Sequence, residues 1–128
     1  MRALLGLVAC LAAFPVWANE PWRVMRETPA EVVAIDLSSL ERSAGQVRFR
    51  ERRVVRDGRI HPNSLRPVRE VLSRGVVDCR ARRIATLSRA VFSDEDALID
   101  HQATRLQQAV WQLLPREDSL FRQLCGRS

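Results

Sequence analysis

The chain has 128 residues, a formal net charge of +6 and three cysteines. That length allows one domain with a single modest core and excludes a multidomain architecture. All basic residues are arginine and none is lysine. Because a GC-rich genome explains that bias simply, the excess of arginine alone is weak evidence for an anion-binding function.

The first residues have the three-part layout of a secretory signal peptide. Met1-Arg2 is a short positive start, residues 3–13 are almost wholly apolar, and Val16-Trp17-Ala18 fits a cleavage site. We therefore expect a signal peptide over 1–18, a single domain over 19–128, and an exported protein in the periplasm or at the cell surface. Alternatively, residues 7–10 resemble a lipobox, which would place a lipid anchor on Cys10. No later apolar run is long enough to span a membrane.

Cys79 and Cys125 remain after the leader is removed. In an exported domain two such cysteines predict one disulfide. Because the bridge would close a long loop, it would stabilise the fold by roughly 4 kcal/mol. The alternative is two free, buried thiols.

The first half of the domain is typical of strands. Short strands are expected over residues 21–25 and 31–35, and Asp36 fits the cap of a following turn. The clearest strand is Gln46–Arg56, where Val47 and Phe49 alternate with arginines. Such alternation predicts a sheet with one face on a core and the other in water. Asp57-Gly58 signals a turn, residues 61–67 a loop, and residues 68–79 a further strand.

The second half is ambiguous. Residues 81–92 have both helical and strand spacing. Residues 99–113 show helical intervals, but Asp94 to Asp96 could instead be a hairpin turn followed by a strand over 97–101. After Pro115, an apolar stripe ending at Cys125 predicts a short terminal helix, with Gly126 placed to end it.

Several short motifs occur in an order that is similar to a known family. They are Trp22, Asp36-x-Ser38-Ser39-Leu40, Asp78-Cys79-Arg80-x-Arg82-Arg83, Trp111-x-x-Leu114-Pro115 and Leu124-Cys125-Gly126. Together they resemble the surface-adhesin protein E family of small exported bacterial domains. The resemblance covers nearly all of the domain, although the chain has no tyrosine where related early strands are rich in it.

The resemblance implies an α+β fold, with an antiparallel β-sheet and a C-terminal helix joined to it by the disulfide Cys79–Cys125. It also implies strands at 82–92 and 97–101, against the local helical spacing. The family's namesake binds host extracellular-matrix proteins, partly through a basic region that corresponds here to residues 52–69. Similarity in the sheet and the disulfide does not by itself imply that this chain is an adhesin.

A basic segment is the leading candidate for a contact surface. Twelve arginines and four acids lie between Arg48 and Arg83, and acids gather elsewhere, as in Asp94-Glu95-Asp96. We therefore expect a basic and a more acidic region on the molecule. The candidate partner-binding residues are Arg48, Arg50, Arg52, Arg53, Arg56 and Arg59. Their partner would be a matrix protein or an anionic polysaccharide, and the alternative is a solvated strand face. No nucleic-acid partner is expected, because no aromatic residue interleaves with the basic run.

No catalytic constellation is recognisable. Neither His61 nor His101 adjoins a nucleophile in a known motif. The acids from Asp94 to Asp100 lack the glycine and the alternation of a calcium loop. We expect no metal site and no cofactor. The leading hypothesis is a non-enzymatic, adhesin-like binding module of the cell envelope. The alternatives are a periplasmic structural or assembly accessory that binds no polyanion and, third, an enzyme with a histidine beside a carboxylate.

Overall fold

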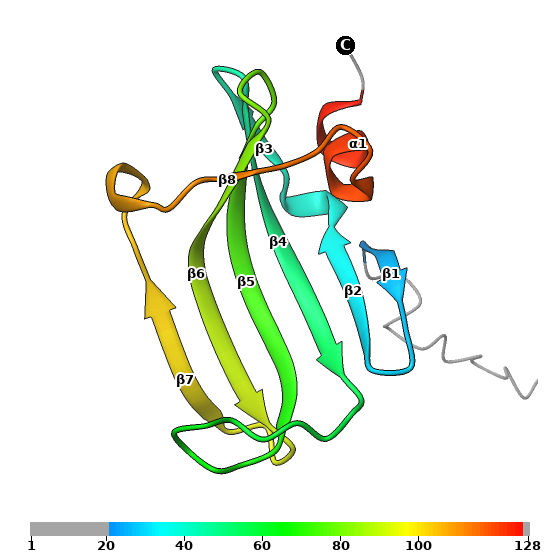
Figure 1. The fold of residues 1–128 in the computed structure, drawn as a ribbon, viewed down its shortest axis with the longest axis vertical. Helices are drawn as coiled ribbons and strands as arrows, with labels where there is room; N and C mark the ends of the chain where they lie inside the picture. The colour runs from blue at the N-terminus through cyan, green and yellow to red at the C-terminus, as the bar shows by residue number, and fades with distance from the viewer. Residues whose placement is uncertain (1–20, 127–128) are drawn as a thin grey trace, which may run out of the picture.

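The computed structural model describes residues 21–126, so the expected signal peptide over 1–18 and the alternative anchor at Cys10 lie outside the described residues. Within that range the chain forms one eight-stranded sheet and one α-helix (Figure 1). The elements are β1 (Trp22–Glu27), β2 (Glu31–Asp36), η2 (Leu37–Ser39), β3 (Glu41–Ser43), β4 (Gln46–Val55), β5 (Val68–Asp78), β6 (Arg83–Ser93), β7 (Leu98–Ala103), η3 (Leu106–Gln108), β8 (Gln112–Leu113) and α1 (Ser119–Cys125).

The sheet is antiparallel throughout, with the strand order β1-β2-β4-β5-β6-β7. Strand β3 pairs with the start of β4, and β8 pairs with the start of β6. The segment between β7 and α1 crosses one face of the sheet before the helix begins (Figure 1). The expected α+β architecture, an antiparallel sheet with a C-terminal helix, is therefore confirmed.

The main core lies between α1 and one face of the sheet, which we call the helix face. Ile35, Val47, Phe49 and Val77 project from three strands onto that face and pack with Leu124 of the helix. Each of them is almost fully buried. The alternation of Gln46–Arg56 thus predicted the buried side of β4 correctly.

The helix is joined to the sheet by the disulfide Cys79–Cys125, whose Cα atoms are 5.6 Å apart. Arg42 adds a second link, because its Nη1 donates a 2.6 Å hydrogen bond to the carbonyl oxygen of Leu124. Asp118 caps the helix N-terminus by accepting from the amide of Leu120. The predicted bridge is confirmed, and the helix ends at Gly126 as expected.

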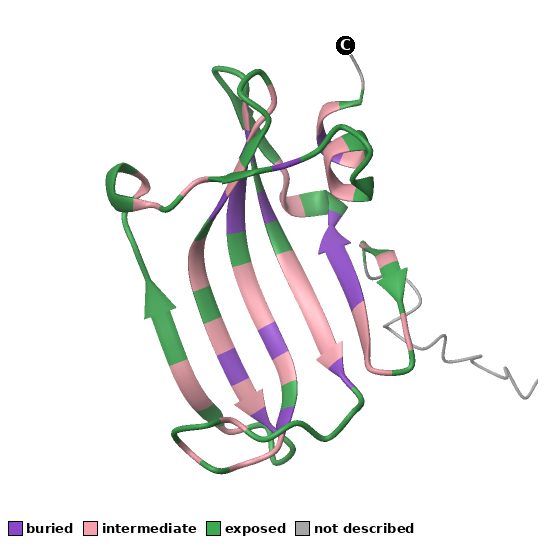
Figure 2. Ribbon diagram, in the orientation of Figure 1, coloured by how far each residue is buried: buried purple, intermediate pink, exposed green. Residues whose placement is uncertain are grey.

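A smaller apolar cluster lies at the other end of the helix face. Val55, Val68, Val71 and Val91 are buried there, with Ile99 packed against them. Figure 2 shows that buried residues concentrate in the central strands, while β1 and β7 at the two edges are mostly exposed. The chain therefore stabilises the two ends of its helix face with separate groups of side chains.

The two ambiguous segments are strands. Residues 83–93 form β6 between β5 and β7, and residues 98–103 form β7 after a tight turn at Asp94 to Asp96. Asp96 has a φ of 58°, which that turn requires. The strands implied by the family resemblance are thus confirmed, and the alternative helix over 99–113 is wrong.

Candidate functional site

The six arginines singled out as a contact surface are divided between the two faces of the sheet. Successive side chains of a strand point to opposite faces. Arg48, Arg50 and Arg52 therefore lie on the face opposite α1, which we call the arginine face, whereas Arg53 lies on the helix face. Arg56 and Arg59 follow the end of β4. The six do not form one continuous surface.

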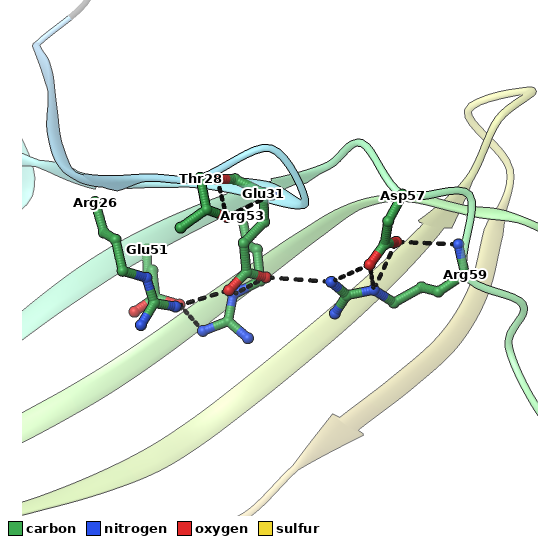
Figure 3. A network of polar contacts seen from close by, with 7 residues as sticks. All are labelled: Arg26, Thr28, Glu31, Glu51, Arg53, Asp57 and Arg59. Carbon is green, nitrogen blue, oxygen red and sulfur yellow. Dashed lines mark hydrogen bonds and ion pairs between the residues drawn. The ribbon is translucent and has the colours of Figure 1, made fainter.

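Glu31 on β2 is the centre of an ion-pair network on the helix face (Figure 3). Its Oε1 lies 2.7 Å from Nη2 of Arg26, and its Oε2 lies 3.5 Å from Nε of Arg53 and 3.6 Å from Nη2 of Arg59. The side chain of Glu31 is only 14% exposed. Because this half-buried carboxylate needs its cations, Arg53 and Arg59 stabilise the fold rather than present free charge.

Two further acids belong to the same network, and their pKa values move in opposite directions. Burial raises the pKa of Glu51, although Arg53 and Arg26 act against that shift. Hydrogen bonds from the Arg59 side chain lower the pKa of Asp57, and the same contact raises the pKa of Arg59. The Arg59 fork contacts Asp57 at distances between 2.9 and 3.2 Å.

Four more arginines in the basic segment also have acidic partners. The pairs are Arg52–Glu70 at 2.9 Å, Arg56–Glu27 at 3.1 Å, Arg66–Glu95 at 3.0 Å and Arg69–Asp96 at 3.0 Å. The last two join the basic segment to the acidic turn between β6 and β7. The fold thus brings together part of the two regions that were expected to lie apart.

Arg48, Arg50 and Arg74 lie together in a part of the basic segment that has few acidic contacts. Arg50 on β4 stands directly opposite Arg74 on β5, and Arg48 lies two residues from Arg50 on the same face. All three are exposed. Like charges directly opposite one another in a sheet are destabilising. A cross-strand arginine pair is therefore a feature that stability alone does not favour.

These arginines line a groove on the arginine face, made of two adjoining hollows. The first hollow is about 400 Å³ and is lined by Ser39, Glu41, Arg48, Phe49, Arg50, Arg74, Gly75, Leu87 and Ser88. The second is also about 400 Å³ and is lined by Trp22, Arg50, Glu51, Leu72, Ser73, Arg74, Ser88, Ala90 and His101. Because Arg50, Arg74 and Ser88 belong to both hollows, they form the middle of what we call the arginine groove.

Two carboxylates partly offset the charge of the groove. Glu41 stands opposite Arg48 in the sheet, and Oδ2 of Asp36 lies 3.6 Å from Nη1 of Arg50. Hydrogen bonding from Ser38 is the main cause that lowers the pKa of Asp36, and Arg50 adds to it. Arg50 also lies over the ring of Trp22, 5.9 Å from its centroid. Arg74 makes no ion pair with any residue in the described part of the chain.

Neither histidine is placed as an obvious catalyst. His61 is half-buried, with Nε2 3.3 Å from Oδ2 of Asp100 and Nδ1 accepting a hydrogen bond from the amide of Ser64. These contacts attach the loop after β4 to β7. His101 lines the second hollow. Across residues 21–126 no three histidine, cysteine or acidic side chains gather as metal ligands would.

Trp22, Arg74 and His101 line the groove but were not among the partner-binding candidates chosen from the sequence. They come from β1, β5 and β7 and meet only through the pairing of the strands. No local motif indicates that they meet, because cross-strand register is a property of the folded sheet. Once the register is known, strand alternation places all three on the same face of the sheet as Arg48 and Arg50.

Comparison with known proteins gives a consistent result for family and fold. The selenomethionine form of Haemophilus influenzae protein E has a similar structure, with a TM-score of 0.57 and 15% sequence identity. The similarity covers 84% of this chain and 87% of the protein E chain. Crystal form II of the same protein gives a TM-score of 0.56 at 15% identity, with 83% and 87% covered. Protein E from non-typeable Haemophilus influenzae gives 0.54 at 16% identity, with 84% and 75% covered.

At such identities these structures establish the fold alone. A search of curated protein sequences gives no match. Within residues 21–126 the single helix is too short to cross a membrane. The family profile described as Surface-adhesin protein E matches residues 22–126, almost the whole described range. This match supports an adhesin-like surface protein, and the chain belongs to the surface-adhesin protein E family.

Proposed function

We propose that this chain is an exported, non-enzymatic binding module of the cell envelope and that its arginine groove contacts an acidic macromolecule. The observation that supports this proposal is the placement of Arg48, Arg50 and Arg74 along one groove, with Arg50 and Arg74 directly opposite each other. Three arginines face Glu41 and Asp36 there, while the side chain of Glu51 pairs with Arg53 on the helix face, so the groove keeps a positive charge. Such a groove attracts anions and accelerates their encounter.

The test is binding to a panel of acidic macromolecules, comprising heparin, polyglutamate and purified matrix proteins, at increasing salt. We expect the triple variant R48E/R50E/R74E to lose at least about tenfold in affinity for its anionic partner at about 0.15 M salt, because close charge pairs govern such contacts. Surface plasmon resonance or solid-phase binding measures the change.

A charge-matched control separates the groove from the overall charge. R23E/R105E/R116E replaces three exposed arginines that line neither hollow and make no ion pair with described residues. It alters the net charge equally, so we expect only a small loss of affinity. Equal losses in the two variants would mean that binding follows net charge, and the groove would then not be the contact surface.

The alternative is a periplasmic structural or assembly accessory that binds no polyanion. It is favoured by the many arginines that have acidic partners within the chain, Arg52, Arg53, Arg56 and Arg59 among them. It predicts no retention on any acidic partner and a stable envelope partner by crosslinking. The binding panel distinguishes the two functions.

A further inference from the structure

The geometry of the arginine groove also bears on the chemical class of its ligand. A guanidinium group presents a planar fork of donors, and the two oxygens of a carboxylate match one such fork, so a second fork must share them. Arg50 and Arg74 offer two forks from directly opposite positions in the sheet, where Cβ atoms are about 4.5–5.5 Å apart. A sulfate ester has three free oxygens, so it can accept from both forks at once. The pair therefore suits a sulfate better than a carboxylate.

Both arginines have donors to spare among the described residues. The acidic contact of Arg50 is Asp36 at 3.6 Å, which is longer than a hydrogen bond. Arg74 makes no ion pair and no side-chain hydrogen bond within residues 21–126. Each guanidinium therefore keeps N–H donors for a ligand, in contrast to Arg53 and Arg59, which pair with Glu31.

The second hollow adds a surface for the carrier of the sulfate. Trp22, Leu72 and Ala90 line it beside Arg50 and Arg74. An aromatic face packs well against the CH groups of a sugar ring, and the contact with Arg50 fixes the orientation of Trp22. Ser39 and Ser88 line the first hollow, and their hydroxyls suit the hydroxyl groups of a second ring.

The shape of the groove favours a chain over a lipid. The two hollows adjoin, and neither is an enclosed cavity. Leu72, Ala90 and one face of Trp22 supply the apolar surface of the second hollow. That area is small for an acyl chain, which requires a mostly apolar site that buries most of its length.

Resting on the proposed function, we propose that the arginine groove binds a sulfated polysaccharide, with one sulfate held between Arg50 and Arg74 and the adjoining sugar ring packed on Trp22. Arg48 then lies close enough along β4 to contact a second anionic group, since alternate residues of a strand are about 6.6–6.8 Å apart.

The experiment measures dissociation constants of the purified protein for a size-defined heparin oligosaccharide, its fully desulfated and N-acetylated form, and polyglutamate of similar length. We expect the sulfated chain to bind roughly tenfold or more tightly than either carboxylate ligand, because the third free oxygen of sulfate lets it accept from both forks with less sharing of oxygens. R50K/R74K keeps the charge and removes the forks, and should weaken binding of the sulfated chain by roughly tenfold. R23K/R105K is the matched control and should leave binding unchanged.

Trp22 is tested by two substitutions. W22A should weaken binding of the sulfated oligosaccharide by roughly fivefold without changing the salt dependence, since it removes packing and no charge. W22F keeps an aromatic face, and should retain most of the affinity even if W22A perturbs β1. A far-ultraviolet circular dichroism spectrum of each variant verifies the fold.

The outcomes separate this inference from the proposed function. Equal affinity for polyglutamate and the sulfated chain, or wild-type affinity in R50K/R74K, would overturn the sulfate assignment and leave a general acid-binding groove. Tighter binding to vesicles containing a phosphorylated glycolipid than to the sulfated chain would overturn it in favour of a lipid. Failure to bind any of these acidic ligands or the matrix proteins would remove the proposed function as well.

Discussion

Gly75 shows how one residue is fixed by a contact across the sheet. It stands opposite Phe49, and a Cβ built on it would lie 2.6 Å from Cζ and 2.8 Å from Cε1 of that ring. Phe49 is 5% exposed and belongs to the main core, so its ring has little room to move. The absence of a side chain at residue 75 thus leaves room for the ring of Phe49 next to β5.

We therefore predict that G75A destabilises the protein by about 1–3 kcal/mol, as overpacking of a filled core does. Urea denaturation of the wild type and the variant measures the difference in the free energy of unfolding. The control is a double-mutant cycle with F49L, in which the cost of G75A should become smaller because the smaller side chain relieves the clash. An unchanged cost in the F49L background would contradict the contact as its cause.

At this scale the sequence predicted the face of each side chain on β4 but not its partners. The alternation of Val47 and Phe49 with arginines placed both on the buried face correctly. The need for glycine at residue 75 and the pairing of Arg50 with Arg74 depend on the register of β4 against β5. Register is decided by the whole sheet, and no local pattern in either strand encodes it.

Among the elements, α1 depends most on its surroundings. With seven residues it is far shorter than an isolated stable helix. Leu120, Phe121 and Leu124 pack it against the helix face, and Cys125 ties it to the residue that follows β5. Tertiary contacts and a covalent bond therefore supply the stability that its own hydrogen bonds lack.

Removing the bridge tests this dependence. C79A/C125A opens a loop with a sequence separation of 46 residues, and we predict a loss of about 4 kcal/mol in the free energy of unfolding. Guanidinium denaturation measures it, and the wild type under reducing conditions is the control, because it breaks the bond without changing the core volume by much. A loss below about 1 kcal/mol in both would show that packing alone holds the helix.

The strands β6 and β7 show where sequence patterns fail at the level of elements. The apolar residues of 99–113 recur at helical intervals, yet the chain pairs both 98–103 and 112–113 with β6. Residues 83–93 gain partners on both sides as β6, and these cross-strand contacts outweigh weak local preferences. Only the family resemblance predicted both strands, because it carried information on tertiary structure.

Across the whole molecule, the fold separates arginines by role. Those around Glu31 and those opposite the acidic turn have internal partners, whereas Arg48, Arg50 and Arg74 face a groove. The sequence indicated the basic segment but not this division, since the acidic partners of these arginines come from other strands and turns. We therefore propose a smaller contact surface than the six candidate arginines, one that keeps Arg48 and Arg50 and adds Arg74.

The global stability of the protein should depend on pH through two carboxyls with opposite shifts. The pKa of Asp36 is lowered in the folded protein. Its contribution to the free energy of unfolding is therefore fully present above the pKa of the unfolded chain, about 3.9, and is lost as pH falls through the folded pKa. The pKa of Glu51 is raised by burial, so the folded protein holds that proton more tightly than the unfolded chain. The contribution of Glu51 to the free energy of unfolding is therefore fully present below the pKa of the unfolded chain, about 4.3, and is lost as pH rises through the folded pKa.

E51Q isolates the second effect, because glutamine has the shape of the protonated carboxyl and cannot ionise. We predict that the stability of E51Q relative to the wild type increases as pH rises from about 4 to about 7, since only the wild type must then hold a half-buried charge. Urea denaturation at several pH values measures it. D36N should show the opposite trend in a lower pH window, with its disadvantage nearly constant at neutral pH and shrinking as pH falls below about 4. A relative stability of E51Q that is flat or falls with pH would mean that Arg26 and Arg53 outweigh the burial of Glu51.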